Sequence, residues 1–545
     1  MKKKKIISIG IILFCCSIRS VFSQSLWHIA KENKDILVVT TLFTAHDIRN
    51  YLSNPAELEN AVKWCKQTGI TKVYFESFRD GYQVDRQVLE NAKKRFLSEG
   101  FGVWGCVTTT RHGKSEVGRG WGSGSCYSDE KTQKGLQKIF EYTASIFDHI
   151  MIDDFLFTEC ECEQCIASRC DYSWTKFRCD KMVEMSRERI LKPAKKINPN
   201  VKITIKYPNW YDDFQQRGYD VLRQTQDFDN IYVGTETRDY DYSIRSSGEV
   251  QYGAYFNMRW LGGIGGKKTG GGWFDALGTT ANTYLEQARQ TVLGGAKELM
   301  LFSYGDLIRE TNIYNGWMGT PVANIKAFRE ELPGLFKLAK IIHNKEPKGV
   351  DSPKLANSEP YEESYIYSFM GMLGIPLKPV HEINKQLQAA FFPVQMLKQF
   401  DFSTALRELL EESKPIVVTD GLAKRLKDQS LLTNKNLRVL EIKGEPKNLL
   451  KLGRKELDSL RNHLLEPFGI YLNAPLKVGL YLFEKDCLVM ENFNDELVDV
   501  ELIFSHITKA QKLLILPREN EVTPSSESNV VKLSIMPRTL VVIKY

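Results

Sequence analysis

Between residues 36 and 306 the sequence alternates short apolar, β-branched runs with longer amphipathic stretches. Short continuous apolar runs are typical of buried strands, whereas a 3.6-residue period over ten or more residues indicates a helix. Eight strands are expected in this region, at residues 36–43, 72–78, 101–109, 149–154, 201–207, 230–236, 271–275 and 298–304. A strand–helix unit repeated eight times predicts a (β/α)8 TIM barrel, whose active site lies at the carboxyl ends of its strands.

Two smaller units are expected after the barrel. Residues 346–360 are polar and rich in Pro, Ser and Asn, which is typical of a linker. Expected strands at 364–371, 376–380 and 414–419 alternate with expected helices at 389–398 and 402–413, which predicts a small α/β domain of the flavodoxin or glutamine-amidotransferase type. Short strands with polar turns follow. The predicted organisation is a barrel over 24–345, the α/β domain over 346–470 and a β-sandwich over 471–545.

The first 23 residues resemble a secretory signal. Lys2 to Lys5 precede an apolar run at 6–14, and a cleavage site is expected near Ser23. The competing interpretation is a lipid anchor on Cys15 or Cys16. Neither the leader nor any later stretch is long and apolar enough for a membrane helix. The mature protein is therefore expected to be secreted or periplasmic.

The net charge argues against nucleic-acid binding. The formal charge of +7 includes five basic residues of the expected leader, and the rest of the chain holds 69 basic against 67 acidic residues. So small an excess gives no electrostatic basis for binding a polyanion. With 42% apolar residues the chain can bury substantial cores.

Polar side chains collect at the predicted carboxyl ends of the barrel strands. Barrel strand interiors are normally aliphatic, so charges gathered at one end call for a functional explanation, although any single one could belong to an ion-pair network. The charged or amide residues at these positions are Glu76, Arg79, Arg111, Asp153, Asp154, Lys206, Asn209, Glu236, Arg238, Asp275 and Asp306.

Two carboxylates facing each other across a barrel mouth are the minimal equipment for glycoside hydrolysis. One stays protonated to donate to the leaving oxygen, and the other is ionised to attack or to activate water. Asp154 is the first candidate for the acid/base and Glu236 for the nucleophile or general base, with Asp153 and Asp275 in reserve. Side chains alternate along a strand, so only one of Asp153 and Asp154 can face the lumen unless the strand has ended. The choice between retention and inversion stays open.

Aromatic residues crowd the same loops and fit a carbohydrate ligand. Sugar rings present C–H faces that stack on aromatic planes, while their hydroxyls need polar partners. Trp210, Trp260 and Trp273 are expected to contribute to such a pocket.

Cys160, Cys162 and Cys165 lie close together after the fourth strand, at spacings that suit one structural zinc ion or a pair of disulfides. Cys106, from the third strand, is the expected fourth zinc ligand, with Cys126 and Cys170 as competitors. No organic cofactor is expected. The odd total of nine cysteines after the leader leaves at least one outside any disulfide pairing.

A barrel with its acid after strand four, a C-x-C-x-x-C loop at Cys160, Cys162 and Cys165, a small α/β domain and a terminal β-domain resembles the β-galactosidases of glycoside hydrolase family 42. The resemblance implies structural zinc on these cysteines and Cys106, and oligomerisation through the middle domain. The family's acid/base is a glutamate after asparagine, where this chain has Asp153-Asp154. The family's nucleophile is a glutamate after strand seven, where this chain has Asp275.

The sequence thus predicts an exported glycoside hydrolase acting on an oligosaccharide or polysaccharide fragment, and a homo-oligomer. Two alternatives stay open. One is a non-catalytic glycan-binding protein on a degenerate barrel. The other is a hydrolase or lyase that uses the acids to hold Ca²⁺ or Mg²⁺.

Overall fold

The computed structural model describes residues 25–114, 125–238, 250–314, 316–517 and 526–545, so the expected leader lies outside the described residues. Its first part is a closed barrel of eight parallel strands, in which β1 pairs with both β9 and β2. The strands are β1 (Val38–Phe43), β2 (Lys72–Arg79), β4 (Gly102–Val107), β5 (His149–Ile152), β6 (Lys202–Tyr207), β7 (Asn230–Gly234), β8 (Thr269–Asp275) and β9 (Glu298–Phe302). All eight predicted strands and the barrel are confirmed.

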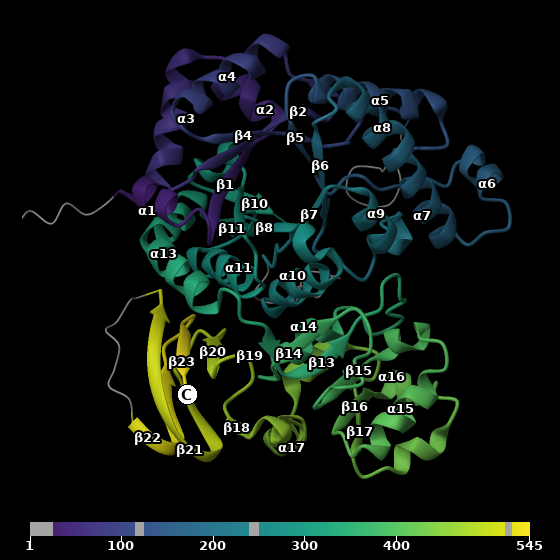
Figure 1. The fold of residues 1–545 in the computed structure, drawn as a ribbon, viewed down its shortest axis with the longest axis vertical. Coiled ribbons are helices and arrows are strands. Elements are labelled where there is room, and N and C mark those ends of the chain that lie inside the picture. Colours follow the sequence, from purple (N-terminus) through teal and green to yellow (C-terminus); the bar gives the residue numbers. More distant parts are fainter. Residues whose placement is uncertain (1–24, 115–124, 239–249, 315, 518–525) are drawn as a thin grey trace, which may run out of the picture.

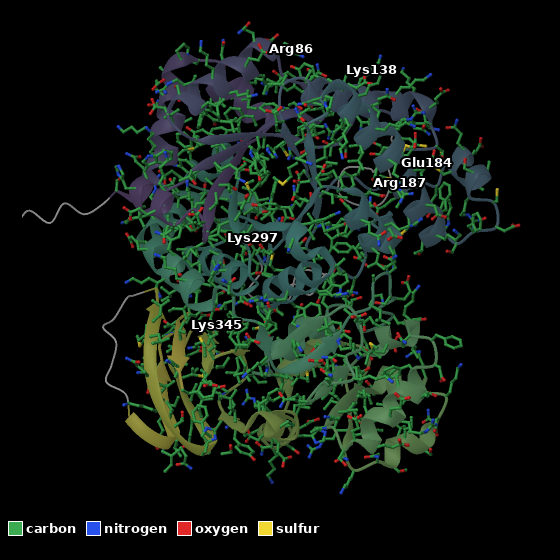
Figure 2. All side chains as sticks on the ribbon, in the orientation of Figure 1. Arg86, Lys138, Glu184, Arg187, Lys297 and Lys345 are labelled. Atoms are coloured by element: carbon green, nitrogen blue, oxygen red, sulfur yellow. The ribbon has the colours of Figure 1, made fainter. Side chains whose placement is uncertain are left out.

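Helices surround the barrel (Figure 1). The main ones are α3 (Pro55–Gln67), α4 (Arg86–Ser98), α5 (Glu130–Ala144), α7 (Trp174–Met185), α9 (Val221–Asp227), α10 (Tyr252–Gly265), α11 (Ala281–Leu293) and α13 (Pro321–Ile342). Local sequence sets their starts: Asn54 caps α3 by accepting from the Ala56 N–H at 2.9 Å, with proline at the first helical position. Charged side chains on the outer helices, such as Arg86 and Lys138, lie at the edge of the molecule (Figure 2).

The middle unit is a five-stranded parallel sheet in the order β14-β13-β15-β16-β17, which is the flavodoxin order 2-1-3-4-5. Its strands are β13 (Val350–Pro353), β14 (Leu377–Val380), β15 (Ala390–Phe392), β16 (Ile416–Thr419) and β17 (Leu437–Leu440). The predicted α/β class is confirmed.

Three local expectations for the middle unit were wrong. The expected linker contains β13, an interior strand of this sheet, and also β12 (Pro347–Lys348), which pairs with β19 (Val478–Phe483). The expected strand at 364–371 forms helix α14 (Ile366–Gly371), while the expected helix at 389–398 holds β15 and a 3₁₀ helix, Val394–Lys398. These short apolar runs carry no period that separates buried helix from buried strand.

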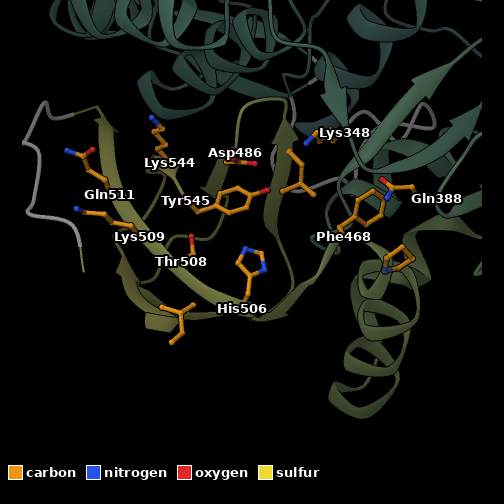
Figure 3. Close-up of a pocket in the computed structure, with 13 residues that line it drawn as sticks. Lys348, Gln388, Phe468, Asp486, His506, Thr508, Lys509, Gln511, Lys544 and Tyr545 are labelled. Atoms are coloured by element: carbon orange, nitrogen blue, oxygen red, sulfur yellow. The ribbon is translucent and has the colours of Figure 1, made fainter. Parts of the chain in front are cut away.

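The C-terminal strands form a β-domain of seven connected strands, in which the long strand β21 belongs to both groups of paired strands. They are β12, β18 (Ile470–Asn473), β19, β20 (Cys487–Asn492), β21 (Val498–Leu516), β22 (Ser526–Ile535) and β23 (Leu540–Lys544). The long strand β21 pairs with β18, β22 and β23. His506, Lys544 and Tyr545 help to line a hollow of about 620 Å³ on this sheet (Figure 3).

A buried ion network joins the barrel to the C-terminal sheet. Arg289 of α11 pairs through two nitrogens with Glu331 of α13, at 2.6 Å each, and reaches Glu491 of β20 at 3.3 Å. Arg538 pairs with Glu286 of α11 at 3.1 Å. Because these polar groups are buried, each requires its partner, and the contacts hold the sheet against the barrel. In the part of the chain that is described, no helix is long and apolar enough to cross a membrane.

Candidate active site at the barrel mouth

Asp153 and Asp154 follow β5 directly, and both turn toward the same lysine. The strand ends at Ile152, so the alternation that would send the two side chains to opposite faces no longer applies. The Asp154 N–H donates to Asp153 Oδ1 at 2.8 Å, and the Phe155 N–H donates to the Asp153 carbonyl at 2.8 Å. This tight turn leaves the Asp153 side chain 3% exposed and that of Asp154 18% exposed. Asp154 is therefore the carboxyl of the pair that solvent reaches.

Lys206 of β6 bridges carboxylates that follow β5 and β7, the two strands on either side of β6. Its Nζ lies 2.9 Å from Asp154 Oδ2, 2.9 Å from Glu236 Oε1 and 3.6 Å from Asp153 Oδ1. The same ammonium stands 4.1 Å from the ring centroid of Trp273. Burial opposes the charged ammonium, but the three carboxylates raise the pKa of Lys206 above its usual range.

Burial and neighbouring charges shift the pKa values of the two aspartates in opposite directions. Burial raises the pKa of Asp154, and with the negative charges of Asp153 and Glu236 it outweighs Lys206, so that this pKa is about 7. Burial would also raise the pKa of Asp153, but Lys206 and Arg79 lower it below its usual range. One aspartate thus stays ionised, while the other can carry a proton near neutral pH.

Arg79 and Glu76 hold Asp153 in place. Arg79 donates from Nη2 to Asp153 Oδ2 at 2.8 Å and from Nε to Glu76 Oε2 at 2.8 Å. Thr108 reaches both carboxylates, donating to Glu76 and lying 3.1 Å from Asp153 Oδ2. The Glu76 carboxylate also accepts the Ala45 N–H at 2.7 Å. Because these groups are buried and mutually paired, they hold Asp153 in position.

Asp275 is held in an ion pair with Arg238. Arg238 donates from Nε to Asp275 Oδ1 at 2.7 Å and from Nη2 to Oδ2, forming a two-pronged ion pair. Arg238 also lies over the Tyr314 ring, 5.1 Å from its centroid. Asp306 accepts from Ser303 Oγ at 3.1 Å, and burial raises its pKa.

Some of the remaining predicted binding residues contact Glu236 or Lys206, and others do not. Asn209 donates to the Glu236 carbonyl at 2.7 Å and so positions the second carboxylate. Trp273 is buried beneath Lys206, and Trp210 is half-buried under Arg217, 4.6 Å from the ring centroid. The prediction for Trp260 was wrong: its indole N–H donates to the Lys354 carbonyl at 2.7 Å, inside the boundary with the α/β unit. Arg111 is exposed and joins none of the described ion pairs.

A four-cysteine cluster lies beside this site, formed by Cys126, Cys160, Cys162 and Cys165. All four side chains are buried, and their sulfurs lie within 4.8 Å of one another. The Cys126 sulfur is 3.6 Å from those of Cys162 and Cys165, close to the edge of about 3.8 Å that four sulfurs at about 2.3 Å from zinc would form. The donor set therefore fits a closed tetrahedral metal site.

Cys106 was the wrong fourth ligand. It points into the barrel interior, where it packs with Met151 and Tyr74. Cys126 was one of the two competitors, and it lies 19 residues beyond the end of β4, so its spacing in the sequence could not place it beside the other three cysteines. Cys170 is exposed and outside the cluster. Sequence reasoning also missed Thr108, since a lone threonine after a strand carries no distinctive signal.

Comparisons with known proteins agree with a carbohydrate-active barrel. Residues 24–332 match the family model described as probable glycosyl hydrolase, catalytic domain. An uncharacterized protein of Saccharolobus solfataricus is 26% identical over 412 residues, which span 68% of this chain and 64% of that protein.

Two solved structures cover most of this chain at low similarity. An Anoxybacillus α-amylase has a TM-score of 0.40 at 8% identity and covers 94% of this chain and 98% of its own. A GH5_18 variant from Streptomyces cattleya, in complex with Manβ1-4GlcNAc, has a TM-score of 0.39 at 8% identity and covers 76% and 99%.

Proposed function

Because this chain belongs to the family of probable glycosyl hydrolase catalytic domains over residues 24–332, we propose that it hydrolyses a glycosidic bond at the mouth of its barrel. The observation that carries this proposal is the pair Asp154 and Glu236 joined through Lys206. The reaction requires two neighbouring carboxyl groups, one of which can hold a proton, and Asp154 has a raised pKa and is accessible to solvent.

Asp154 is the proposed general acid/base. Its pKa of about 7 lets it donate a proton to the leaving oxygen at neutral pH and then deprotonate the incoming water. Glu236 is the proposed nucleophile, with Lys206 balancing its charge. Asp153 and Arg238 assist without reacting, since each is held in an ion pair.

The separation of the two carboxylates supports a retaining mechanism. Asp154 Oδ2 and Glu236 Oε1 are each 2.9 Å from the same nitrogen, so they are at most about 6 Å apart. Retaining glycosidases hold their carboxyl groups about 5–5.5 Å apart, whereas inverting enzymes need about 6.5–9.5 Å to admit a water.

A panel of aryl glycosides and plant oligosaccharides tests the proposal. The parent protein should hydrolyse at least one member, with the first-formed sugar keeping its anomeric configuration by NMR. Asp154→Asn should lose about 10²–10⁴ in kcat/KM on substrates with poor leaving groups. Asp171→Asn, the same change on an exposed aspartate of the following segment, is the matched control and should keep full activity. Equal activity of parent and Asp154→Asn would rule out the assigned acid.

A mechanism that uses a divalent cation bound by the acids at the barrel mouth is less well supported than this one. Within the described residues, the cysteine cluster is the group of ligand atoms that meets the geometry of a metal site. The carboxylates of Asp153, Asp154 and Glu236 already face the cations of Lys206 and Arg79. Activity should accordingly survive a Ca²⁺ and Mg²⁺ chelator.

We further propose zinc as the ion of the cysteine cluster. Four thiolates would satisfy its tetrahedral coordination, and the closed donor set supports a structural role. The ion would tie the loop that carries Asp154 to the segment that follows β4.

Export, the closer relationship to glycoside hydrolase family 42, and oligomerisation through the α/β unit are proposals as well. The leader sequence supports export, and cleavage near Ser23 would appear in the N-terminal sequence of the secreted protein. The order of barrel, α/β unit and β-sheet supports the family relationship. Light scattering of the purified protein tests the assembly.

A further inference from the structure

A second hollow lies outside the barrel, between its helices α7 and α9 and the carboxyl edge of the α/β sheet. Its volume is about 700 Å³, within the range of about 300–1,000 Å³ that holds small ligands. The barrel helices supply one wall, and the segments that follow β13 and β15 supply the other. In Figure 1 these two helices lie directly above the labels of β15 and α16 (Asp420–Ala423).

This position is the topological switch point of the sheet. The strands β13 and β15 are neighbours, and β14 lies on the far side of β13 while β16 lies on the far side of β15. The chain therefore leaves the two strands in opposite directions and opens a crevice at their carboxyl ends. In open α/β sheets this crevice is where ligands bind.

Unpartnered polar atoms collect at the same edge. Gln395 helps to line the hollow and is only 1% exposed, yet neither its amide nitrogen nor its amide oxygen has a hydrogen-bond partner among the described residues. The side-chain oxygens Asn357 Oδ1, Ser358 Oγ and Glu363 Oε1 are likewise buried without one there. Such atoms are few in native proteins and point to a bound water, ion or ligand. These atoms lie on the segments that follow β13 and β15, which indicates that a ligand binds in the crevice between the two strands.

The charges around the hollow favour a neutral ligand. Lys176 pairs with Asp180 at 2.6 Å, and Arg223 pairs with Asp180 and Asp220 at 2.8 Å each. The cations of this wall are thus already compensated. The segment after β13 has no glycine loop leading into a helix N-terminus, which a phosphate site would use. Carboxylates, amides and the ring of Tyr361, which is 56% exposed, are the groups that bind sugar hydroxyls and stack on sugar rings.

We propose that this crevice binds a neutral mono- or disaccharide, at a site separate from the barrel mouth. Gln395 would rotate to supply a donor and an acceptor to adjacent hydroxyls, and the paired carboxylates of the α7–α9 wall would accept from others. The site goes beyond the proposed hydrolysis and would hold a chain end or a released product.

The test measures saccharide binding and stability in the full-length protein carrying Asp154→Asn. Glucose, galactose, lactose and cellobiose are the probes, each titrated by calorimetry up to about 50 mM, with inorganic phosphate as the charged comparison. Gln395→Leu removes the amide while keeping its approximate shape, and Leu397→Trp fills the hollow. Gln386→Leu makes the same change on an exposed glutamine of the α/β unit and is the matched control.

At least one sugar should bind, and both pocket variants should weaken that binding about tenfold or more. Gln386→Leu should bind the sugar as the parent does. Phosphate should neither bind at the crevice nor compete with the sugar. Gln395→Leu should not lower the melting temperature, because the Gln395 amide makes no hydrogen bond to any of the described residues. The proposal is overturned if no probe shows binding that depends on Gln395 or Leu397, or if phosphate competes. Hydrolysis is measured in a separate assay that compares the parent protein with Asp154→Asn. A negative result for the saccharide site therefore leaves the test of hydrolysis unaffected, and the reverse also holds.

Discussion

Lys206 donates a hydrogen bond from Nζ to Asp154 Oδ2 at 2.9 Å, across the carboxyl ends of the adjacent barrel strands β6 and β5. The same nitrogen contacts Glu236, so a single cation lies between both proposed catalytic carboxyls. The protonation of this trio is therefore the property that experiments can address most directly.

The pH dependence of hydrolysis should have a basic limb near pH 7. Asp154 acts as an acid only while protonated, and its pKa of about 7 means that the protonated fraction falls about tenfold per pH unit above that value. The measurement is kcat/KM against pH on an alkyl glycoside. A dinitrophenyl glycoside, whose leaving group needs no proton, should show a much weaker limb. An identical limb on both substrates would assign it to another group.

Lys206→Met should shift that limb to higher pH and destabilise the fold in a pH-dependent way. Without the ammonium, buried carboxylates face one another, so the pKa of Asp154 rises further. Breaking a buried charge group costs about 3–5 kcal/mol, and the loss should be larger at pH 8 than at pH 5, where carboxyls can take up protons.

Lys202→Met provides the control for this variant, because Lys202 lies on the same strand with its side chain 55% exposed. Chemical denaturation of both variants at the two pH values gives the comparison. A loss at Lys206 that is independent of pH would contradict the bridging role.

Cys126→Ala should abolish zinc retention, whereas Cys106→Ala should not. Cys126 lies in the four-sulfur cluster, and Cys106 lies in the barrel interior. The purified protein should contain about one zinc per chain, measured by metal analysis, and the first variant should lose it together with several degrees of melting temperature. Zinc loss in both variants, or in neither, would refute the assigned ligand set.

Stability should fall as the pH rises toward 8 because of Glu491. Burial raises the pKa of Glu491 from 4.5 to about 8, against the opposing effect of Arg289. A raised acid pKa means that the folded protein binds the proton more tightly than the unfolded chain, so the free energy of unfolding decreases between those two values. Glu491→Gln should flatten this slope in denaturation curves, while Glu501→Gln on the same sheet should leave it intact. An unchanged slope in Glu491→Gln would assign the effect to other groups.

The barrel, the positions of its strands and the acids at its mouth can be predicted from local patterns along the chain. Each strand is a short apolar run, and the acids follow these runs directly, so local order along the chain is sufficient to place Asp153, Asp154 and Glu236 at one edge. The same locality explains the failure in the α/β unit, where runs of a few apolar residues such as β15 and α14 suit either a strand or a helix.

Contacts between residues that are distant in the sequence determine the partner of each of these groups. Arg238 forms an ion pair with Asp275, and Arg79 forms one with Asp153. Cys126, rather than Cys106, completes the cysteine cluster. These pairings join residues that are far apart in the chain, and closure of the barrel brings them within a few ångströms. Burial then sets the energy of each charge, because a desolvated carboxyl responds to every neighbouring charge.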